Sequence, residues 1–146
     1  MKKLKLKNSH FELLFKIIDG DLPFTRSRRR KMFTDILGNK VREREEARMA
    51  LIQKFGKKTT DGKPETVEYI GENGVKGTRF KLEDQEGFNK EFITLYNEEV
   101  IIDIPPSLEE SIELIKDTVK NTDITVKDGE VAIVEDIIKS FDEISE

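Results

Sequence analysis

The side chains that most often perform catalysis are scarce in this sequence. His10 is the only histidine among 146 residues, and there is no cysteine. A zinc site of the usual histidine and cysteine kind is therefore excluded, as is thiol chemistry. No serine stands in a Gly-x-Ser-x-Gly turn, and no glycine-rich phosphate loop is present. Because a single histidine beside a helix start is more often a capping residue than a base, we expect no catalytic residue and no cofactor.

Carboxylates are abundant and keep a magnesium or calcium site open as a hypothesis. Asp19-Gly20-Asp21 resembles the start of a calcium-binding loop, but position 12 of that loop would be Arg30, where a bidentate glutamate is required. Glu98, Glu99 and Asp103 could meet at one strand end, although solvated edge charges explain them more simply. We therefore assign no metal ligands and keep a carboxylate-based, metal-dependent hydrolase as the third functional hypothesis.

A run of basic residues gives the strongest functional signal, and it consists of Arg26, Arg28, Arg29, Arg30 and Lys31. Guanidinium groups match the geometry of phosphates and carboxylates with two hydrogen bonds at once. The run could bind nucleic acid, cover an acidic protein surface or pair with acidic residues of its own chain. No aromatic residues are interleaved for base stacking, and the net charge of the chain is −4. Pairing within the chain or with a protein is therefore preferred to nucleic acid.

Two further arginines, Arg44 and Arg48, lie in the apolar stripe of a long helix predicted over 25–55, on the side of Phe33 and Leu51. An unpaired charge in a protein core is strongly destabilising. These arginines therefore extend outward, meet carboxylates of the third or fourth predicted helix, or face a partner. Since arginine is enriched at protein interfaces, we interpret this stretch as a binding face and predict a two-fold homodimer.

Hydrophobic periodicity predicts the elements that carry these residues. Leu4 and Leu6 alternate with lysine as in an edge strand, and residues 100–104 are the best candidate for its partner strand. A β-hairpin is predicted over about 65–82, with its turn at Asn73-Gly74. A short strand is predicted over 123–126. Helices are predicted to begin near Ser9, Thr25, Asp84, Ser107 and Asp128.

The predicted fold class is α+β, with about five helical segments around a small sheet and a protruding hairpin. The length suits one domain, residues 1–146. The second helix would be about 47 Å long if unbroken, and Gly38-Asn39 is its candidate break.

Charge is distributed unevenly along the chain. Residues 1–48 hold 14 Lys/Arg against 7 Asp/Glu, whereas residues 84–146 hold 5 against 18. Such a chain is expected to present two unlike surfaces to its surroundings. No apolar run approaches the ~20 residues that span a bilayer, and an apolar signal core is missing. We therefore expect a cytoplasmic protein without membrane association.

Several short segments occur in the same order in one family of small proteins. They are Leu4-Lys5-Leu6-Lys7-Asn8, Arg26-Ser27-Arg28, Asp61-Gly62-Lys63-Pro64, Phe88-Asn89-Lys90-Glu91-Phe92 and Glu98-Glu99-Val100-Ile101. Through them most of the chain resembles an uncharacterised family encoded by tailed phages and prophages of Gram-positive bacteria. The resemblance transfers no activity and no catalytic residues. It implies a viral origin, and phage proteins of this size are often virion parts, assembly factors or inhibitors of host systems.

These observations predict a non-enzymatic phage accessory protein that acts by binding another protein, from the host or from the phage. It would serve as a virion or assembly component or as an inhibitor of a host defence complex, in the host cytoplasm or on the virion. The alternative is a nucleic-acid-binding module that uses residues 26–31.

Overall fold

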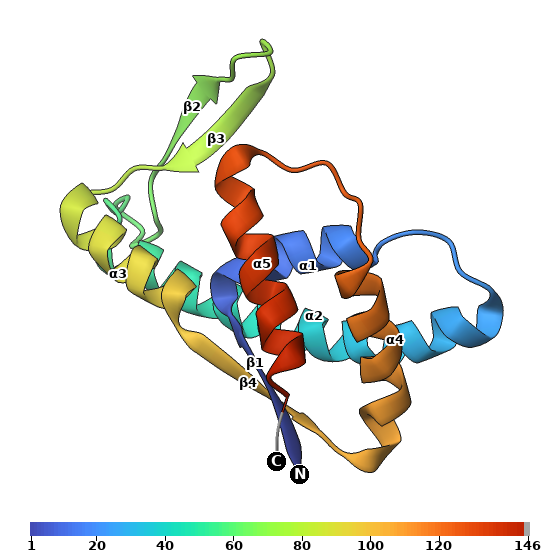
Figure 1. Ribbon diagram of the computed structural model, residues 1–146. Helices are drawn as coiled ribbons and strands as arrows, with labels where there is room; N and C mark the ends of the chain where they lie inside the picture. The colour runs from blue at the N-terminus through green and yellow to red at the C-terminus, as the bar shows by residue number, and fades with distance from the viewer. Residues whose placement is uncertain (145–146) are drawn as a thin grey trace. The chain divides into compact units, whose positions relative to one another are not determined.

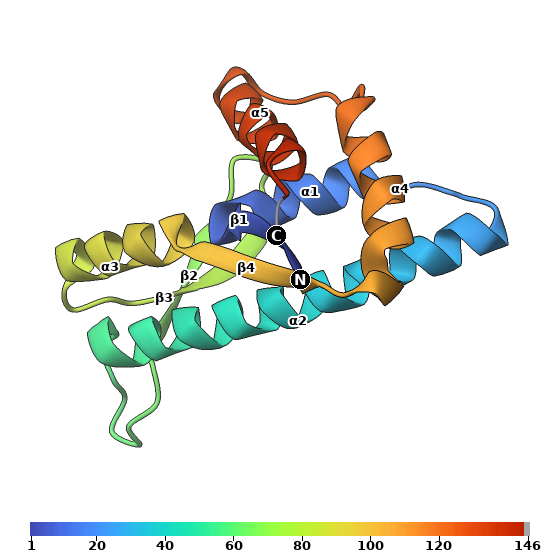
Figure 2. The same cartoon turned by 60° about the horizontal axis from the view of Figure 1, so that its bottom comes forward.

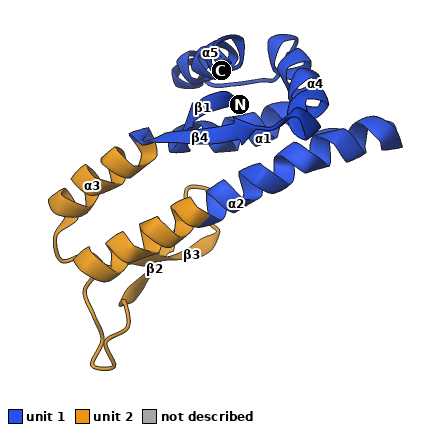
Figure 3. Ribbon diagram, turned by 90° about the horizontal axis from the view of Figure 1, so that it is seen from below, with its two compact units in different colours: residues 1–42, 97–146 blue, residues 43–96 orange. Residues whose placement is uncertain are grey.

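The computed structural model describes residues 1–144 and divides the chain into two compact units (Figure 3). Unit 1 is formed by Met1–Arg42 and Asn97–Glu146, and unit 2 by Glu43–Tyr96. Unit 2 is thus inserted between two segments of unit 1. That residues 1–146 form one domain, whose parts unfold together, stays a prediction.

Helices and two small antiparallel sheets make up the structure, which confirms the α+β class (Figure 1). The strands are β1 (Lys2–Lys7), β2 (Thr66–Ile70), β3 (Lys76–Phe80) and β4 (Glu99–Ile104). The helices are α1 (Phe11–Ile18), α2 (Phe24–Phe55), α3 (Gln85–Asn97), α4 (Glu109–Lys120) and α5 (Asp128–Asp142), with 3₁₀ turns at Asn8–His10 and Pro106–Leu108.

Strands β1 and β4 pair antiparallel and form the sheet of unit 1. Leu4 lies opposite Ile102 and Leu6 opposite Val100, so the predicted strand partner is confirmed. Alternation with period two turns both leucines inward, where they are fully buried, and leaves Lys3, Lys5 and Lys7 exposed.

The amphipathic helices of unit 1 cover this sheet and one another. Helix α5 packs on β1, and α4 packs on both α1 and α5 (Figure 2). The first half of α2 contributes Phe33 and Leu37, which are fully buried. The ring of Phe33 meets Phe141 of α5 edge to face, with 6.2 Å between centroids. One continuous apolar core therefore holds unit 1 together.

The strand predicted over 123–126 is wrong. Residues 122–127 form no strand. Ile124 and Val126 do turn half-buried side chains to the core, but no strand among residues 1–144 pairs with this segment. The Thr125 carbonyl accepts a hydrogen bond from Lys16 Nζ instead (2.6 Å).

Helix α2 is continuous through Gly38-Asn39 over 32 residues, about 48 Å at 1.5 Å per residue. Gly38 is exposed, and nothing within 4 Å would meet a Cβ atom there. The cost of a helical glycine, ~1 kcal/mol, is therefore small beside the burial of Leu37 and Ile52 on the same helix.

Unit 2 contains the end of α2, the hairpin β2–β3 and most of α3. Thr66 pairs with Phe80 and Ile70 with Lys76, which confirms the predicted hairpin. Its turn uses the expected residues, since Gly74 has a φ of 77° and the Asn73 side chain accepts a hydrogen bond from the Val75 N–H.

A ring of three backbone hydrogen bonds anchors the hairpin. Lys57 N–H donates to the Lys81 carbonyl, Lys81 N–H to the Glu65 carbonyl, and Glu65 N–H to the Lys57 carbonyl, at 2.7–2.8 Å. Residues 56–58 therefore pair with both chain segments at the base of the hairpin, Gly56 with Leu82 and Lys58 with Pro64. Because residue 56 follows the last residue of α2 directly, the ring ties the hairpin to that helix end.

We predict that Leu4→Ala lowers the free energy of unfolding by about 2–5 kcal/mol, because it removes a fully buried side chain next to Ile102. Lys5→Ala, one residue along the same strand, should change it by no more than about 0.5 kcal/mol. Urea unfolding with an unchanged m-value would measure both. Equal urea midpoints for the two variants would show that β1 does not pack on the rest of unit 1.

Candidate functional site

The basic run lies in the first turns of α2, and unit 1 itself engages three of its five members. Arg29 pairs with Glu110 of α4 at 3.4 Å, and Lys31 pairs with Asp35 one turn along α2 at 2.9 Å. Arg30 donates a hydrogen bond of 2.6 Å to the Ile18 carbonyl, and so satisfies a free acceptor at the end of α1.

Arg26 and Arg28 are exposed, and neither makes an ion pair within the part of the chain that the structure describes. The arginine side chains of the run are therefore engaged in different ways and do not form one uniform phosphate-binding cluster.

Arg44 is buried in unit 2, where its side chain is 5% exposed. Its guanidinium lies 5.1 Å from the ring centroid of Tyr96 and 3.3 Å from Glu45, and Glu45 also pairs with Arg48 at 3.3 Å. Both arginines thus contact the same carboxylate of their own helix. Sequence reasoning missed Glu45 and Tyr96, although Glu45 and Arg48 stand at the i, i+3 spacing typical of helical ion pairs.

The aromatic residues of α3 form a ladder on one face of the helix. Phe88, Phe92 and Tyr96 recur every four residues, with ring centroids 5.5 and 4.3 Å apart. All three are only half-buried. The Asp84 side chain caps the helix by accepting from the Gly87 N–H (2.9 Å), as predicted. The helix that carries the aromatic ladder therefore has a capped N-terminus.

The end of the hairpin exposes apolar side chains, and we call residues 69–76 the hairpin tip. Tyr69, Ile70 and Val75 are 46%, 72% and 62% exposed. They flank a tight turn closed by the hydrogen bond from Gly71 N–H to the Val75 carbonyl (2.8 Å). Sequence reasoning missed these residues because apolar residues next to a turn are typical of ordinary strand ends.

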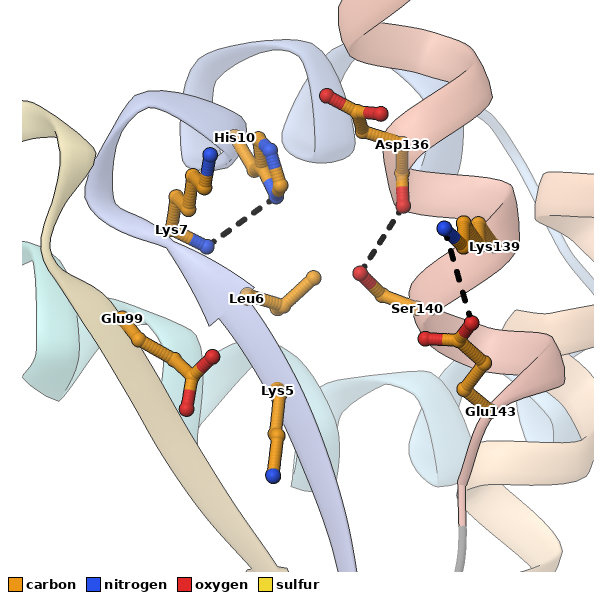
Figure 4. A pocket seen from close by; sticks show the side chains of 9 residues that line it. All are labelled: Lys5, Leu6, Lys7, His10, Glu99, Asp136, Lys139, Ser140 and Glu143. Carbon is orange, nitrogen blue, oxygen red and sulfur yellow. Dashed lines mark hydrogen bonds and ion pairs between the residues drawn. The ribbon is translucent and has the colours of Figure 1, made fainter.

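His10 lines a cavity of about 210 Å³ in unit 1, together with residues of β1 and α5 (Figure 4). Its Nδ1 accepts a hydrogen bond from the Lys7 N–H (3.2 Å), which leaves the proton of the neutral ring on Nε2. Ser140 Oγ donates to the Asp136 carbonyl (2.9 Å), and Lys139 pairs with Glu143 (3.8 Å). The serine hydroxyl is therefore engaged with backbone and not with the imidazole.

Burial lowers the pKa of His10, and Lys7 adds to this effect while the charge of Asp136 opposes it. The imidazole is therefore neutral at pH 7, in keeping with its role as an acceptor for the chain that enters the 3₁₀ turn. These observations fit the structural role predicted for a single histidine beside a helix start.

Among residues 1–144, no three side chains of the metal-binding types gather closely enough to hold an ion. In the same range, no helix combines the length and apolar character needed to cross a bilayer. Comparison with protein-family models, curated proteins and solved structures gives no match for this chain.

The lowered pKa of His10 predicts a pH dependence of stability. The unfolded chain binds a proton near pH 6.5 and the folded chain only at lower pH, so the free energy of unfolding should fall between about pH 7 and pH 5. His10→Asn keeps an acceptor for the Lys7 N–H and should remove this slope. Asp142, whose pKa is lowered by its hydrogen bond to Lys120, acts only in a separate window below about pH 4. An unchanged slope in the His10→Asn variant would contradict the assignment.

Proposed function

We propose that this protein acts without catalysis by binding another protein, and that the hairpin tip is the main contact. The observation that carries this proposal is the exposure of Tyr69, Ile70 and Val75 on a hairpin whose strands pack substantially only on each other. A two-stranded hairpin is marginal in water, and exposed apolar groups add nothing to its stability. Such side chains are typical of contacts to a partner.

Burying the side chains of the hairpin tip would release enough free energy to support binding to a partner protein. Fully burying a large apolar side chain gains roughly 1.5–3 kcal/mol, and tyrosine is among the residues that most often dominate interface energies. The ring of backbone hydrogen bonds through Lys57, Glu65 and Lys81 holds the base of the hairpin. Because the anchored hairpin has less conformational freedom to lose, binding has a smaller entropic cost and the affinity is higher.

The core of unit 2 supports the same proposal. Ile52 is its one buried apolar side chain, while the aromatic ladder of α3 and Phe55 remain half-exposed. An inserted unit with so little buried apolar surface gains stability from any partner that covers its aromatic residues.

The nucleic-acid alternative is less well supported. Unit 1 engages Arg29, Arg30 and Lys31, which leaves Arg26 and Arg28 as the arginines of the run most available to phosphates. A role as a phage virion component, assembly factor or inhibitor of a host defence complex remains the prediction that the sequence resemblance adds.

The tip can be tested with a photoreactive residue. We predict that p-benzoylphenylalanine at position 70 forms a covalent adduct with one protein species in cells that make this protein, because Ile70 is the most exposed of the three apolar tip residues. The matched control is position 101, where an isoleucine of unit 1 is 44% exposed. The same adducts at both positions, or none at position 70, would refute the proposal.

The basic run can be tested separately with Arg28, Arg29 and Arg30 replaced by alanine. If these residues bound duplex DNA, the logarithmic salt slope of binding would fall by about three. We expect no measurable change in any DNA binding and only a small loss of stability, because exposed pairs such as Arg29–Glu110 are worth ~0–1 kcal/mol. Submicromolar, salt-sensitive binding of the unchanged protein to DNA, lost in the triple variant, would favour the alternative.

A further inference from the structure

The two strands of the hairpin have open outer edges. Hydrogen bonds from Lys81 N–H to the Glu65 carbonyl and from Gly71 N–H to the Val75 carbonyl show that the odd-numbered residues bond across the hairpin. In an antiparallel ladder the alternate, even-numbered residues then direct their N–H and C=O groups away from the partner strand. The outward set is Lys76, Thr78 and Phe80 on β3, and Thr66, Glu68 and Ile70 on β2.

No other backbone group of residues 1–144 hydrogen-bonds to either edge. Residues 56–58 pair only at the base of the hairpin, beyond β2 and β3. An open edge with an apolar tip is a template for another strand, and proteins that stay monomeric usually block such an edge.

The two edges differ in how they would accept a second copy of themselves. If β2 paired along its full length with the same strand of a second molecule, Glu68 would lie opposite the other Glu68. Like charges directly opposite are destabilising. The edge of β2 is therefore protected against pairing with itself.

The edge of β3 is self-complementary. Full-length antiparallel pairing places Thr78 opposite Thr78, Lys76 opposite Phe80, and Arg79 opposite Gly77 of the second copy. No like charges lie directly opposite each other, Arg79 and its copy are only diagonal neighbours, and paired threonines favour such a ladder. Every outward N–H and C=O of β3 would gain a partner.

Gly77 adds a specific reason for this pairing. It has no side chain, and the ring of Tyr69 covers it so closely that a Cβ atom at Gly77 would lie 2.9 Å from ring atoms. The Arg79 of a second copy, opposite Gly77, would therefore meet the Tyr69 ring without obstruction. A guanidinium over a tyrosine ring makes a favourable cation–π contact.

We propose that two copies of this chain associate through β3 about a two-fold axis at Thr78, and form a four-stranded antiparallel sheet in the order β2-β3-β3-β2. A two-stranded hairpin is marginal in water, and a stable sheet needs at least three strands, which the dimer would provide. The interface uses the outer edge of β3, whereas Ile70, the most exposed apolar residue of the tip, lies on β2, so the proposed dimer does not depend on the partner proposed above. It places the homodimer expected from the sequence on the hairpin and not on the arginines of α2.

A cysteine at position 78 tests the register directly, because the chain has no other cysteine. Outward-facing residues that lie opposite each other form a hydrogen-bonded pair with Cα atoms about 5.5 Å apart, within the range of a disulfide. We expect Thr78→Cys to give a covalent dimer as the main product when oxidised by oxidised glutathione at micromolar protein concentration. Glu68→Cys, on the other edge, is the matched control and should stay largely monomeric.

A second pair of variants tests the edge without a cross-link. Thr78→Pro removes an outward N–H and leaves the ladder within the hairpin intact, and Glu68→Pro does the same on β2. By sedimentation, the unchanged protein should be a dimer at micromolar concentration. Thr78→Pro should raise the dissociation constant at least tenfold, and Glu68→Pro should leave it unchanged. A monomeric parent protein, equal cross-linking at positions 68 and 78, or equal effects of the two prolines would overturn the proposal.

Discussion

The pairing of β1 with β4 is the constraint on which the rest of the structure depends. It joins the start of the chain to the segment that follows unit 2, so that Leu4 and Leu6 meet Val100 and Ile102 across all of the inserted residues. The entropy of closing a loop grows only slowly with loop length, so an inserted unit costs little once the strand pair is buried. Because unit 1 buries its own core, unit 2 is free to carry half-buried aromatic rings and open strand edges.

Sequence patterns predicted an element correctly wherever neighbouring residues determine that element. The alternation around Leu4 and Leu6, the Asn73-Gly74 turn and the Asp84 cap each follow from neighbouring residues, and each is confirmed. The strand expected over 123–126 failed because alternation of Ile124 and Val126 describes any extended segment with one buried side, whether or not a partner strand exists. A partner is a property of the tertiary structure and leaves no mark within those residues.

The candidate site was harder to predict for the same reason. The helical period correctly put Arg44 on the inner side of α2, but its position against Tyr96 depends on where α3 packs. The hairpin tip was missed because Ile70 and Val75 look like ordinary strand residues, and their exposure follows from what does not cover them. The stack of Phe88, Phe92 and Tyr96, in contrast, could have been recognised from their i, i+4 spacing.

The uneven charge of the sequence acquires a different meaning in the structure. Most of the basic start and most of the acidic end of the chain belong to unit 1, where Lys2 pairs with Glu109 and Arg29 with Glu110. Part of the charge asymmetry is therefore neutralised within one unit and is not displayed as two opposed surfaces. The surfaces that we propose for recognition, the apolar tip and the free backbone edge of the hairpin, would make contacts that depend on shape and hydrogen-bond register. Binding through such surfaces responds weakly to salt, in contrast to binding through clustered arginines.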